Sequence, residues 1–331
     1  MRAIPSPEQV MLRDTAQRLA ATMAVITPGD IKGFDRNAGW RSLVETGLTA
    51  MRLRDDGAPL ATGYEAGLAV EAVGGQLLPV PLLGHLLAQE LIALSGAQSD
   101  DGIYALAMTR GLDQVAAPGQ ADAVVFDGVG AEFVVWLGED GSVHRSRLTA
   151  GPESGADLCR PFLSADVYAA TEVLGAPLSP DDRIRWTAFA LSMMCAEMIG
   201  VMRTGLTQAV EYAKTRVQYD QPIGSFQAVQ HMCADILVRT EAAASAAQYA
   251  AWAVDVLPPS ESLLAARTAK AFCAGAGRDV GETLMQVYGG IGQTWEHVAH
   301  LRARRLIVDA KLFGDEADQL LHIADLRMGA A

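Results

Sequence analysis

The sequence Arg216-Val-Gln-Tyr-Asp-Gln-Pro-Ile-Gly-Ser-Phe-Gln-Ala-Val-Gln-His231 joins two long helical patterns. Pro222 stops the first helix because proline has no backbone N–H to donate, and Gly224 supplies a turn. Ser225 is the predicted N-cap of the next helix, whose apolar face begins at Phe226. The stretch is therefore the corner of a helical hairpin, and it carries an arginine, an aromatic ring and several amides.

A second corner follows at Gln286-Val-Tyr-Gly-Gly-Ile-Gly-Gln-Thr-Trp-Glu-His297. One helix ends at Gly289-Gly290, and the next begins after a short loop. Adjacent glycines carry no side chains, so an anionic or planar ligand can approach the backbone there. From the residues alone, both corners are either ligand sites or ordinary interhelical turns with Arg216 and Glu296 as surface charges.

Long helical patterns surround both corners. Four segments are predicted as helices, several of them longer than average, at about 182–217, 225–257, 260–287 and 296–312. Helices of this length joined by short loops form an antiparallel four-helix bundle. Gly200 and Gly205 are costly inside a helix, so we expect another helix to approach closely there.

Two other patterns precede the bundle. From Ser6 to about Ser99 the apolar residues recur at helical spacing, which predicts a small helical domain. Between about 102 and 176, short runs rich in β-formers, such as Glu132-Phe-Val-Val-Trp-Leu137, are separated by Asp-Gly turns and predict an antiparallel β-domain. The predicted fold class is α+β, mainly α, with an N-terminal helical domain at 1–100, a small β-domain at 101–178 and the bundle at 179–331.

Composition restricts the partners of the chain. Among 331 residues, 26 Lys and Arg against 39 Asp and Glu give a net charge of −13, which would repel a nucleic acid. The most apolar stretch, 186–202, is interrupted by Glu197 and is too short for a bilayer, so it is predicted to be a core helix rather than a membrane span. The first residues do not resemble a secretory signal, and the four cysteines are dispersed along the chain. Both observations predict free thiols in a reducing cytoplasm, and the spacing of the cysteines predicts no metal site.

Taken together, the two corners resemble motifs of the acyl-CoA dehydrogenase family, in which R-x-Q-F-G-x-P-I-x-x-F-Q is followed later in the C-terminal bundle by Q-x-x-G-G-x-G. The resemblance is dense from about 188 to 305, and the segment 71–81 looks like a helix end of the family's N-terminal domain. It implies an oxidoreductase that uses tightly held FAD to remove hydrogens from the α and β carbons of an acyl-CoA thioester. Such enzymes pass the electrons to an electron-transfer flavoprotein.

The resemblance also implies which residues hold FAD. In the family, the first motif reaches the FAD of a neighbouring subunit, and the second holds its adenosine end. The cofactor-binding residues implied here are Arg216, Gln218, Tyr219, Ile223, Phe226, Gln286, Gly289 and Gly290. A guanidinium can pair in a forked manner with a pyrophosphate, and aromatic rings offer apolar faces. A site divided between two chains predicts an oligomer.

The carboxylate base that this chemistry requires is missing from the expected places. The resemblance puts it at Gly275 or at Phe313, and neither is an acid. Asp315 and Glu316 are the fallback candidates, because a small gap would bring either into place; otherwise the two acids are the solvated start of a helix. Asp220 stands where the family usually has Gly, which puts a negative charge near an anionic cofactor.

With these departures and a β-domain that looks shortened, the chain resembles the short subunits of two-gene acyl-CoA dehydrogenases of bacterial steroid degradation. In such α2β2 heterotetramers a homologous full-length chain supplies the base, and Trp295-Glu296-His297 looks like that branch. The hypothesis is a subunit that completes the FAD site of a partner, with a steroid-derived acyl-CoA as the substrate. Two alternatives stay open: a self-sufficient homomeric dehydrogenase that uses Asp315 or Glu316, and a non-enzymatic scaffold or acyl-CoA-binding subunit.

Overall fold

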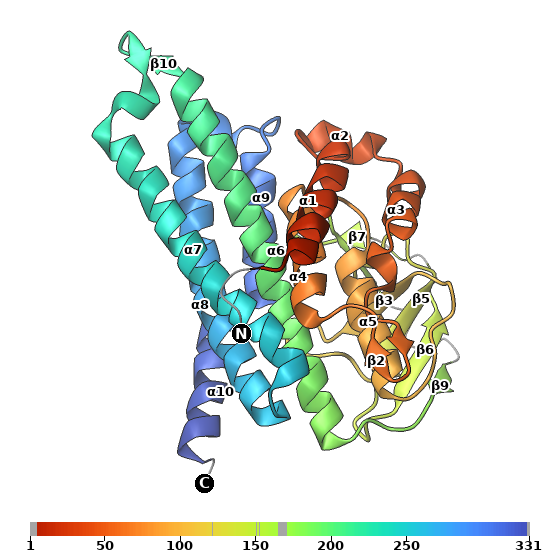
Figure 1. Cartoon of the computed structure of the whole chain (residues 1–331). Coiled ribbons are helices and arrows are strands. Elements are labelled where there is room, and N and C mark those ends of the chain that lie inside the picture. Colours follow the sequence, from red (N-terminus) through yellow and green to blue (C-terminus); the bar gives the residue numbers. More distant parts are fainter. Residues whose placement is uncertain (1–4, 121, 150, 152, 165–170, 330–331) are drawn as a thin grey trace.

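The computed structural model describes residues 5–120, 122–149, 151, 153–164 and 171–329. Long helices of the C-terminal half form one side of the molecule, and the N-terminal helices with the main sheet form the other (Figure 1). The α+β, mainly α fold class is confirmed. Strands of the main sheet lie between Tyr104 and Leu174, whereas the division into three domains at 100/101 and 178/179 stays a prediction.

The N-terminal part is helical, as the sequence predicts. Its helices are α1 (Pro7–Thr22), α2 (Pro28–Gly33), α3 (Arg36–Glu45), α4 (Gly63–Gly75) and α5 (Leu82–Leu94), with the 3-10 turn η1 (Leu48–Ala50) and the short hairpin of β1 (Arg54–Asp55) and β2 (Ala58–Pro59) before α4. Helix α1 begins where the sequence pattern begins, because Ser6 and Gln9 form a capping box.

The main sheet is mixed. Its strands are β3 (Tyr104–Met108), β4 (Val124–Phe126), β5 (Phe133–Leu137), β6 (Val143–Arg147), β7 (Glu153–Ser154), β8 (Phe162–Ser164) and β9 (Glu172–Leu174), in the order β7-β8-β4-β3-β5-β6-β9. The antiparallel prediction is correct for every pair except β3 and β5, which run parallel. Strands β4 and β5 are the two neighbours of β3 and run in opposite directions, so one of them must be parallel to β3.

The predicted bundle consists of α6 (Pro180–Thr215), α7 (Gln227–Val256), α8 (Pro259–Tyr288) and α9 (Ala299–Lys311). A further helix, α10 (Glu316–Met328), packs against α8, and it begins at Asp315 and Glu316, as the interpretation of these two acids as a helix start predicts. The corners are made by β10 (Val217–Gln218), β11 (Gln221–Pro222) and η2 (Ile223–Ser225), and by η3 (Gly289–Gln293). The prediction of Ser225 as an N-cap is wrong, because a 3-10 turn intervenes: its hydroxyl donates to the carbonyl of Pro222, and α7 starts after Phe226.

Helix α6 is the centre of the fold. In the described part of the chain it is the one helix long and apolar enough to cross a membrane, but most of its apolar window is buried, as expected of a core helix. A Cβ at Gly200 would collide with the backbone oxygen of Glu71 in α4, and one at Gly205 would lie 2.6 Å from Leu284 in α8. The close helix approach predicted at both glycines is therefore confirmed.

Charged side chains are buried together where the sheet, α6 and α9 meet. Arg160 donates to Glu197 of α6 at 2.6 Å and also to Asp309 of α9. Arg305 of α9 donates to the same Glu197 at 2.9 Å and also to Asp157. We call these five residues the buried ion cluster, since none is more than 6% exposed. Glu197, which interrupts the apolar run in the sequence, is thus paired inside the core.

Asp127, which follows β4, connects the sheet to the N-terminal helices. Its buried carboxylate accepts the backbone N–H of Gly84, in the first turn of α5, at 2.8 Å. No side chain caps α5 at its own N-cap residue, Pro81, so Asp127 takes that role from another element. Burial raises the pKa of Asp127 to about 6, and the nearby Arg160 guanidinium opposes that rise.

Candidate functional site

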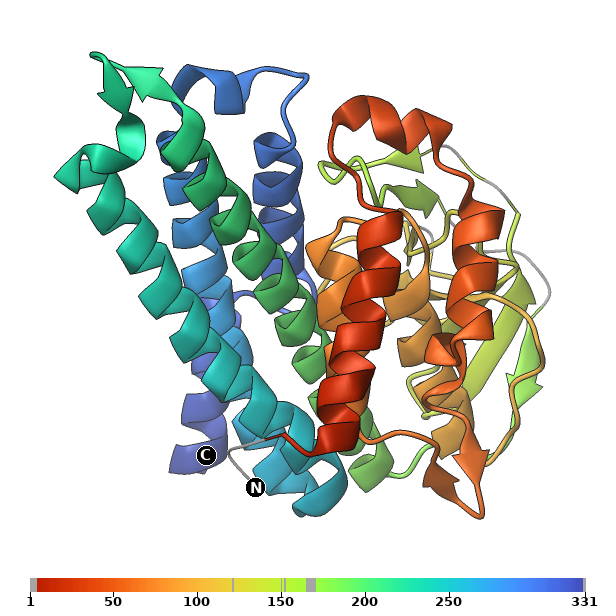
Figure 2. The ribbon, with the colours of Figure 1, turned by 45° about the horizontal axis from the view of Figure 1, so that its top comes forward.

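The two corners predicted to bind FAD lie at the same end of the bundle (Figure 2). The ring centroid of Tyr212, in the last turn of α6, lies 5.0 Å from that of Tyr288 at the end of α8. Tyr288 in turn lies 4.4 Å from the ring of His297, which follows η3. The fold therefore brings together two motifs that are about seventy residues apart in the sequence.

A strained turn forms the tip of the first corner. Strands β10 and β11 pair Gln218 with Gln221, which leaves Tyr219 and Asp220 as the two turn residues. Their φ angles are 52° and 62°, the pattern of a type I′ turn, which favours glycine or asparagine. The side chain of Tyr219 is 88% exposed, and its ring meets that of Phe226 edge-on at 6.2 Å.

The corner residues have the chemistry that FAD requires. Arg216, Gln218 and Gln286 are exposed, while Ile223 and Phe226 are half-buried. Arg216 forms no ion pair with a carboxylate in the ranges that the structure describes, so its guanidinium is available to a pyrophosphate. Gly289 has a φ of 61°, and a Cβ at Gly289 or Gly290 would meet no atom within 4 Å, so a flat ligand can lie on this backbone.

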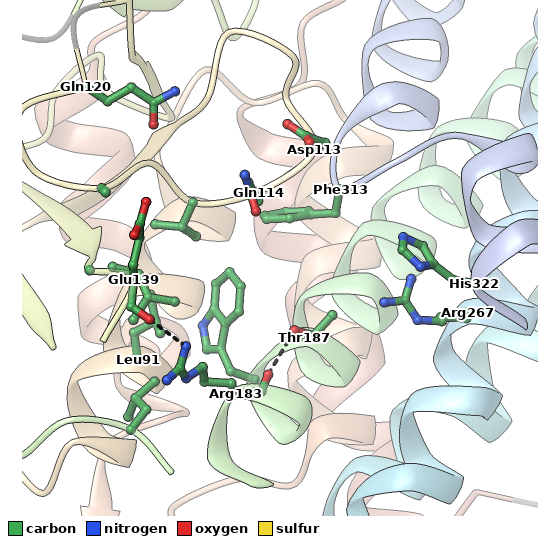
Figure 3. Close-up of a pocket in the computed structure, with 16 residues that line it drawn as sticks. Leu91, Asp113, Gln114, Gln120, Glu139, Arg183, Thr187, Arg267, Phe313 and His322 are labelled. Carbon is green, nitrogen blue, oxygen red and sulfur yellow. Dashed lines mark hydrogen bonds between the residues drawn. The ribbon is translucent and has the colours of Figure 1, made fainter. Parts of the chain in front are cut away.

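A cavity of about 350 Å³ lies between loops of the main sheet and the helices α6, α8 and α10 (Figure 3). Phe313, in the loop between α9 and α10, forms part of its wall and is only 7% exposed. Its ring meets that of Trp186 edge-on at 5.7 Å, and its N–H donates to the carbonyl of Leu112 at 2.7 Å. Phe313 has a φ of 59°, so these contacts hold a bulky residue in a left-handed conformation.

The acids proposed as fallback bases lie outside this cavity. Asp315 is the N-cap of α10 and pairs with Lys311, whose hydrogen bond lowers the pKa of Asp315 to about 2. Glu316 lies over Gly275, since a Cβ added at Gly275 would be 3.0 Å from Oε2 of Glu316. Gly275, the other position implied by the resemblance, therefore faces α10 and does not line the cavity.

The polar side chains that do line the cavity were missed by the sequence analysis. They include Arg183 from α6, Arg267 from α8 and His322 from α10, together with Asp113 and Glu139 from loops of the sheet. Asp113 and Glu139 are exposed, and Asp113 accepts a hydrogen bond from the hydroxyl of Thr109. No spacing in the sequence could have grouped these residues, because each comes from a different element.

The cysteines and histidines form no metal site within the residues that the structure describes. Cys159, Cys195 and Cys273 are buried and Cys233 is half-buried, and all four thiols are free. Burial raises the pKa of Cys159 to about 12, so this thiol is protonated and unreactive at neutral pH.

Comparisons with known proteins agree with this architecture. A family model described as "Acyl-CoA dehydrogenase, C-terminal domain" matches residues 190–326. The chain is 33% identical over 326 residues to "Acyl-CoA dehydrogenase IpdE2" of Mycobacterium tuberculosis, and the match covers 93% of each chain.

Two solved structures have a similar fold. The Tcur3481-Tcur3483 steroid ACAD matches with a TM-score of 0.79 and 22% identity, over 97% of this chain and 98% of the other. A chain of the ChsE4-ChsE5 complex from Mycobacterium tuberculosis matches with a TM-score of 0.78 and 20% identity, over 100% of both chains. At these identities the likeness establishes the fold.

Proposed function

Because the chain belongs to the acyl-CoA dehydrogenase family, we propose that it is one subunit of a heteromeric FAD-dependent dehydrogenase. Members of this family are flavoproteins, which agrees with the cofactor predicted from the sequence. FAD supplies the electron acceptor when two hydrogens are removed from an acyl-CoA thioester. The role of this chain is to complete the FAD site of a homologous partner that provides the base.

The observation that carries this proposal is Phe313. A phenyl ring cannot accept a proton, yet Phe313 stands where the resemblance puts the base and lines the cavity. The nearest acids along the chain, Asp315 and Glu316, point elsewhere and already have partners. Asp113 and Glu139, the acids in the cavity lining, are exposed loop residues, and Asp113 already accepts a hydrogen bond from Thr109. We therefore assign the base to another chain.

The corner residues have defined roles in this proposal. Arg216 pairs with the FAD pyrophosphate, while Tyr219 and Phe226 provide an apolar face beside it. Gln286 donates or accepts hydrogen bonds at the adenosine end, where Gly289 and Gly290 leave the backbone accessible. Ile223, half-buried against the bundle, and Gln218, in the β10–β11 hairpin, complete the corner.

The comparisons support a heteromeric assembly and a bulky substrate. One similar fold is that of a chain in a complex of two differently named subunits, and another is described as a steroid ACAD. We therefore extend the proposal to an α2β2 heterotetramer, a steroid-derived acyl-CoA as substrate and an electron-transfer flavoprotein as acceptor. A cytoplasmic location fits these partners.

Co-expression with a homologous full-length chain tests the proposal. The chain expressed alone should lack visible flavin absorption, whereas the co-purified complex should be yellow and should reduce its flavin when an acyl-CoA is added. In that complex, Arg216→Gln should lower the flavin content at least tenfold, because a charged partner of the pyrophosphate is lost. Arg278→Gln, an exposed arginine on α8, is the matched control and should leave the flavin content unchanged.

Two results would favour the alternatives. A yellow, active homo-oligomer of this chain that loses activity in Glu316→Gln would make it a complete dehydrogenase. A native complex that contains no flavin would leave only a scaffold or acyl-CoA-binding role.

A further inference from the structure

Trp295, in the loop after η3, is an exposed aromatic residue that the fold holds in one orientation. It is 60% exposed, and its indole stacks on the ring of His300 in α9, with 5.4 Å between the ring centroids and 24° between the planes. The same imidazole donates from Nε2 to the backbone carbonyl of Trp295 at 3.1 Å. His300 is only 9% exposed, so the ring that supports Trp295 is itself fixed by its surroundings.

The backbone around Trp295 is fixed as well. The N–H of Thr294 donates to the carbonyl of Ile291 at 3.0 Å, and the N–H of His297 donates to the carbonyl of Thr294 at 3.2 Å. The second bond closes a turn with Trp295 and Glu296 as its central residues. Ring and main chain are therefore in place before a ligand arrives, and a preorganised site loses less entropy on binding.

Trp295 belongs to the corner where a ligand can reach the backbone. It follows Gly290 by five residues, and the short turn η3 lies between them. A Cβ at Gly289 or Gly290 would meet no atom within 4 Å, so the approach to this backbone is open. The first corner, with Arg216, lies at the same end of the bundle (Figure 2).

Charge assigns the two ends of a dinucleotide to the two corners. The guanidinium of Arg216 suits a pyrophosphate. Glu296, next to Trp295 in the sequence, is exposed, and its carboxylate repels phosphate groups. The uncharged adenine ring is therefore the part of FAD that fits against Trp295. Aromatic side chains bind nucleobases by stacking, because every base presents a flat π surface.

We propose that the exposed face of Trp295 stacks on the adenine of FAD, and that this contact makes the site select FAD over flavins that lack adenine. The inference rests on the proposed function, because it names the specificity residue of the same cofactor site. It concerns binding alone and gives Trp295 no part in the reaction.

Flavin binding to the co-expressed complex, after its own flavin has been removed, tests this inference. FAD should bind the Trp295→Ala complex at least about tenfold more weakly than the wild type, because one base–aromatic stack is lost. FMN has the same flavin but no adenine, so it should bind both complexes equally. Trp295→Phe keeps a flat ring and should retain most of the FAD affinity. Tyr249→Ala removes a 45% exposed aromatic residue near the other end of α7 and should bind FAD as the wild type does.

ADP provides a second measurement, since it carries adenine and a pyrophosphate but no flavin. It should compete with FAD in the wild type and at least about tenfold less well in Trp295→Ala, which keeps the test valid if FMN binds too weakly to measure. Melting temperatures show whether a loss of binding is a loss of folding. Trp295→Leu, which keeps apolar bulk against His300 but has no flat ring, replaces the alanine variant if that variant unfolds.

Two results would overturn the inference while the proposed function stands. One is an unchanged FAD affinity in Trp295→Ala when Arg216→Gln does lower the flavin content, and the other is an equal loss of affinity for FAD and FMN. A wild-type complex that binds no FAD would overturn both.

Discussion

Asp220 illustrates how a single residue can oppose both folding and cofactor binding. It has a left-handed φ of 62° in the tip of the first corner, and it adds a negative charge close to the proposed pyrophosphate partner, Arg216. A glycine has no Cβ to clash in that conformation and carries no charge.

Asp220→Gly should therefore stabilise the chain by about 1 kcal/mol and increase the flavin retained by the complex. Urea unfolding measures the first effect, and flavin absorption after gel filtration measures the second. Asp220→Asn separates the two causes, since asparagine removes the charge and tolerates the left-handed region. If neither variant retains more flavin, the corner does not lie near the anionic part of the cofactor.

Asp127 makes stability depend on pH. Its pKa is about 6 in the fold against 3.8 for an ordinary aspartate, so the folded state holds a proton that the unfolded state has already lost between these values. Stability should therefore fall as pH rises from about 4 through the folded pKa of about 6, and should not change further from this cause above about pH 7.

In Asp127→Asn the side-chain oxygen can still accept the Gly84 N–H, but the titration is gone. We expect this variant to be more stable than the wild type at pH 7.5 by about 1–3 kcal/mol, with the difference shrinking toward pH 4. Denaturant unfolding at both pH values checks this. A difference that is the same at pH 4 and pH 7.5 would show that the carboxyl does not titrate in this range.

At the scale of elements, Gly200 fixes how closely α4 and α6 can approach. Gly200→Ala would place a methyl group against the backbone oxygen of Glu71, and backbone cannot move aside as a flexible side chain does. We expect a loss of about 2–4 kcal/mol, read as a lower melting temperature. Gly281→Ala is the control, because its Cβ would have its nearest contact at 3.6 Å; helix propensity should make that change neutral or slightly stabilising. Equal melting temperatures for the two variants would contradict the tight crossing.

Some elements of the fold could be predicted from the sequence, and others could not. Pro222 and Gly224 are local signals, and they located the first corner correctly. Ser225 is also a local signal, but it does not cap α7. It lies in a 3-10 turn, and the sequence pattern alone does not distinguish such a turn from the start of an α-helix. The parallel pairing of β3 with β5 was also invisible, since it depends on which side of β3 each strand occupies.

The candidate site was only partly predictable for a related reason. The corners carry continuous motifs, so Arg216 and Gly289 could be located from a resemblance. Arg183 and Arg267 are 84 residues apart in the sequence and line one cavity only because α6 and α8 pack around it. Glu197 is a long-range feature with a signal in the sequence, since a charge inside a core helix requires a buried partner.

At the scale of the whole molecule, the buried ion cluster joins the sheet to the bundle. Removing one member leaves its partners charged and unpaired in the core, so Arg305→Met should destabilise the chain by about 3–5 kcal/mol. Arg304→Met, one residue away and near the surface, should change stability by less than about 0.5 kcal/mol. Guanidinium unfolding of both variants provides the comparison. A small loss for Arg305→Met would mean that the cluster relaxes or admits water.

The cluster also has a consequence for biosynthesis. Arg160 and Asp309 are 149 residues apart, so Arg160 leaves the ribosome long before α9, which carries Asp309 and Arg305 of the cluster, has been translated. The nascent chain must keep this region hydrated and loosely packed until nearly all of its length has emerged. Messages truncated before α9 should therefore yield polypeptides that proteases degrade quickly, however complete their earlier helices are.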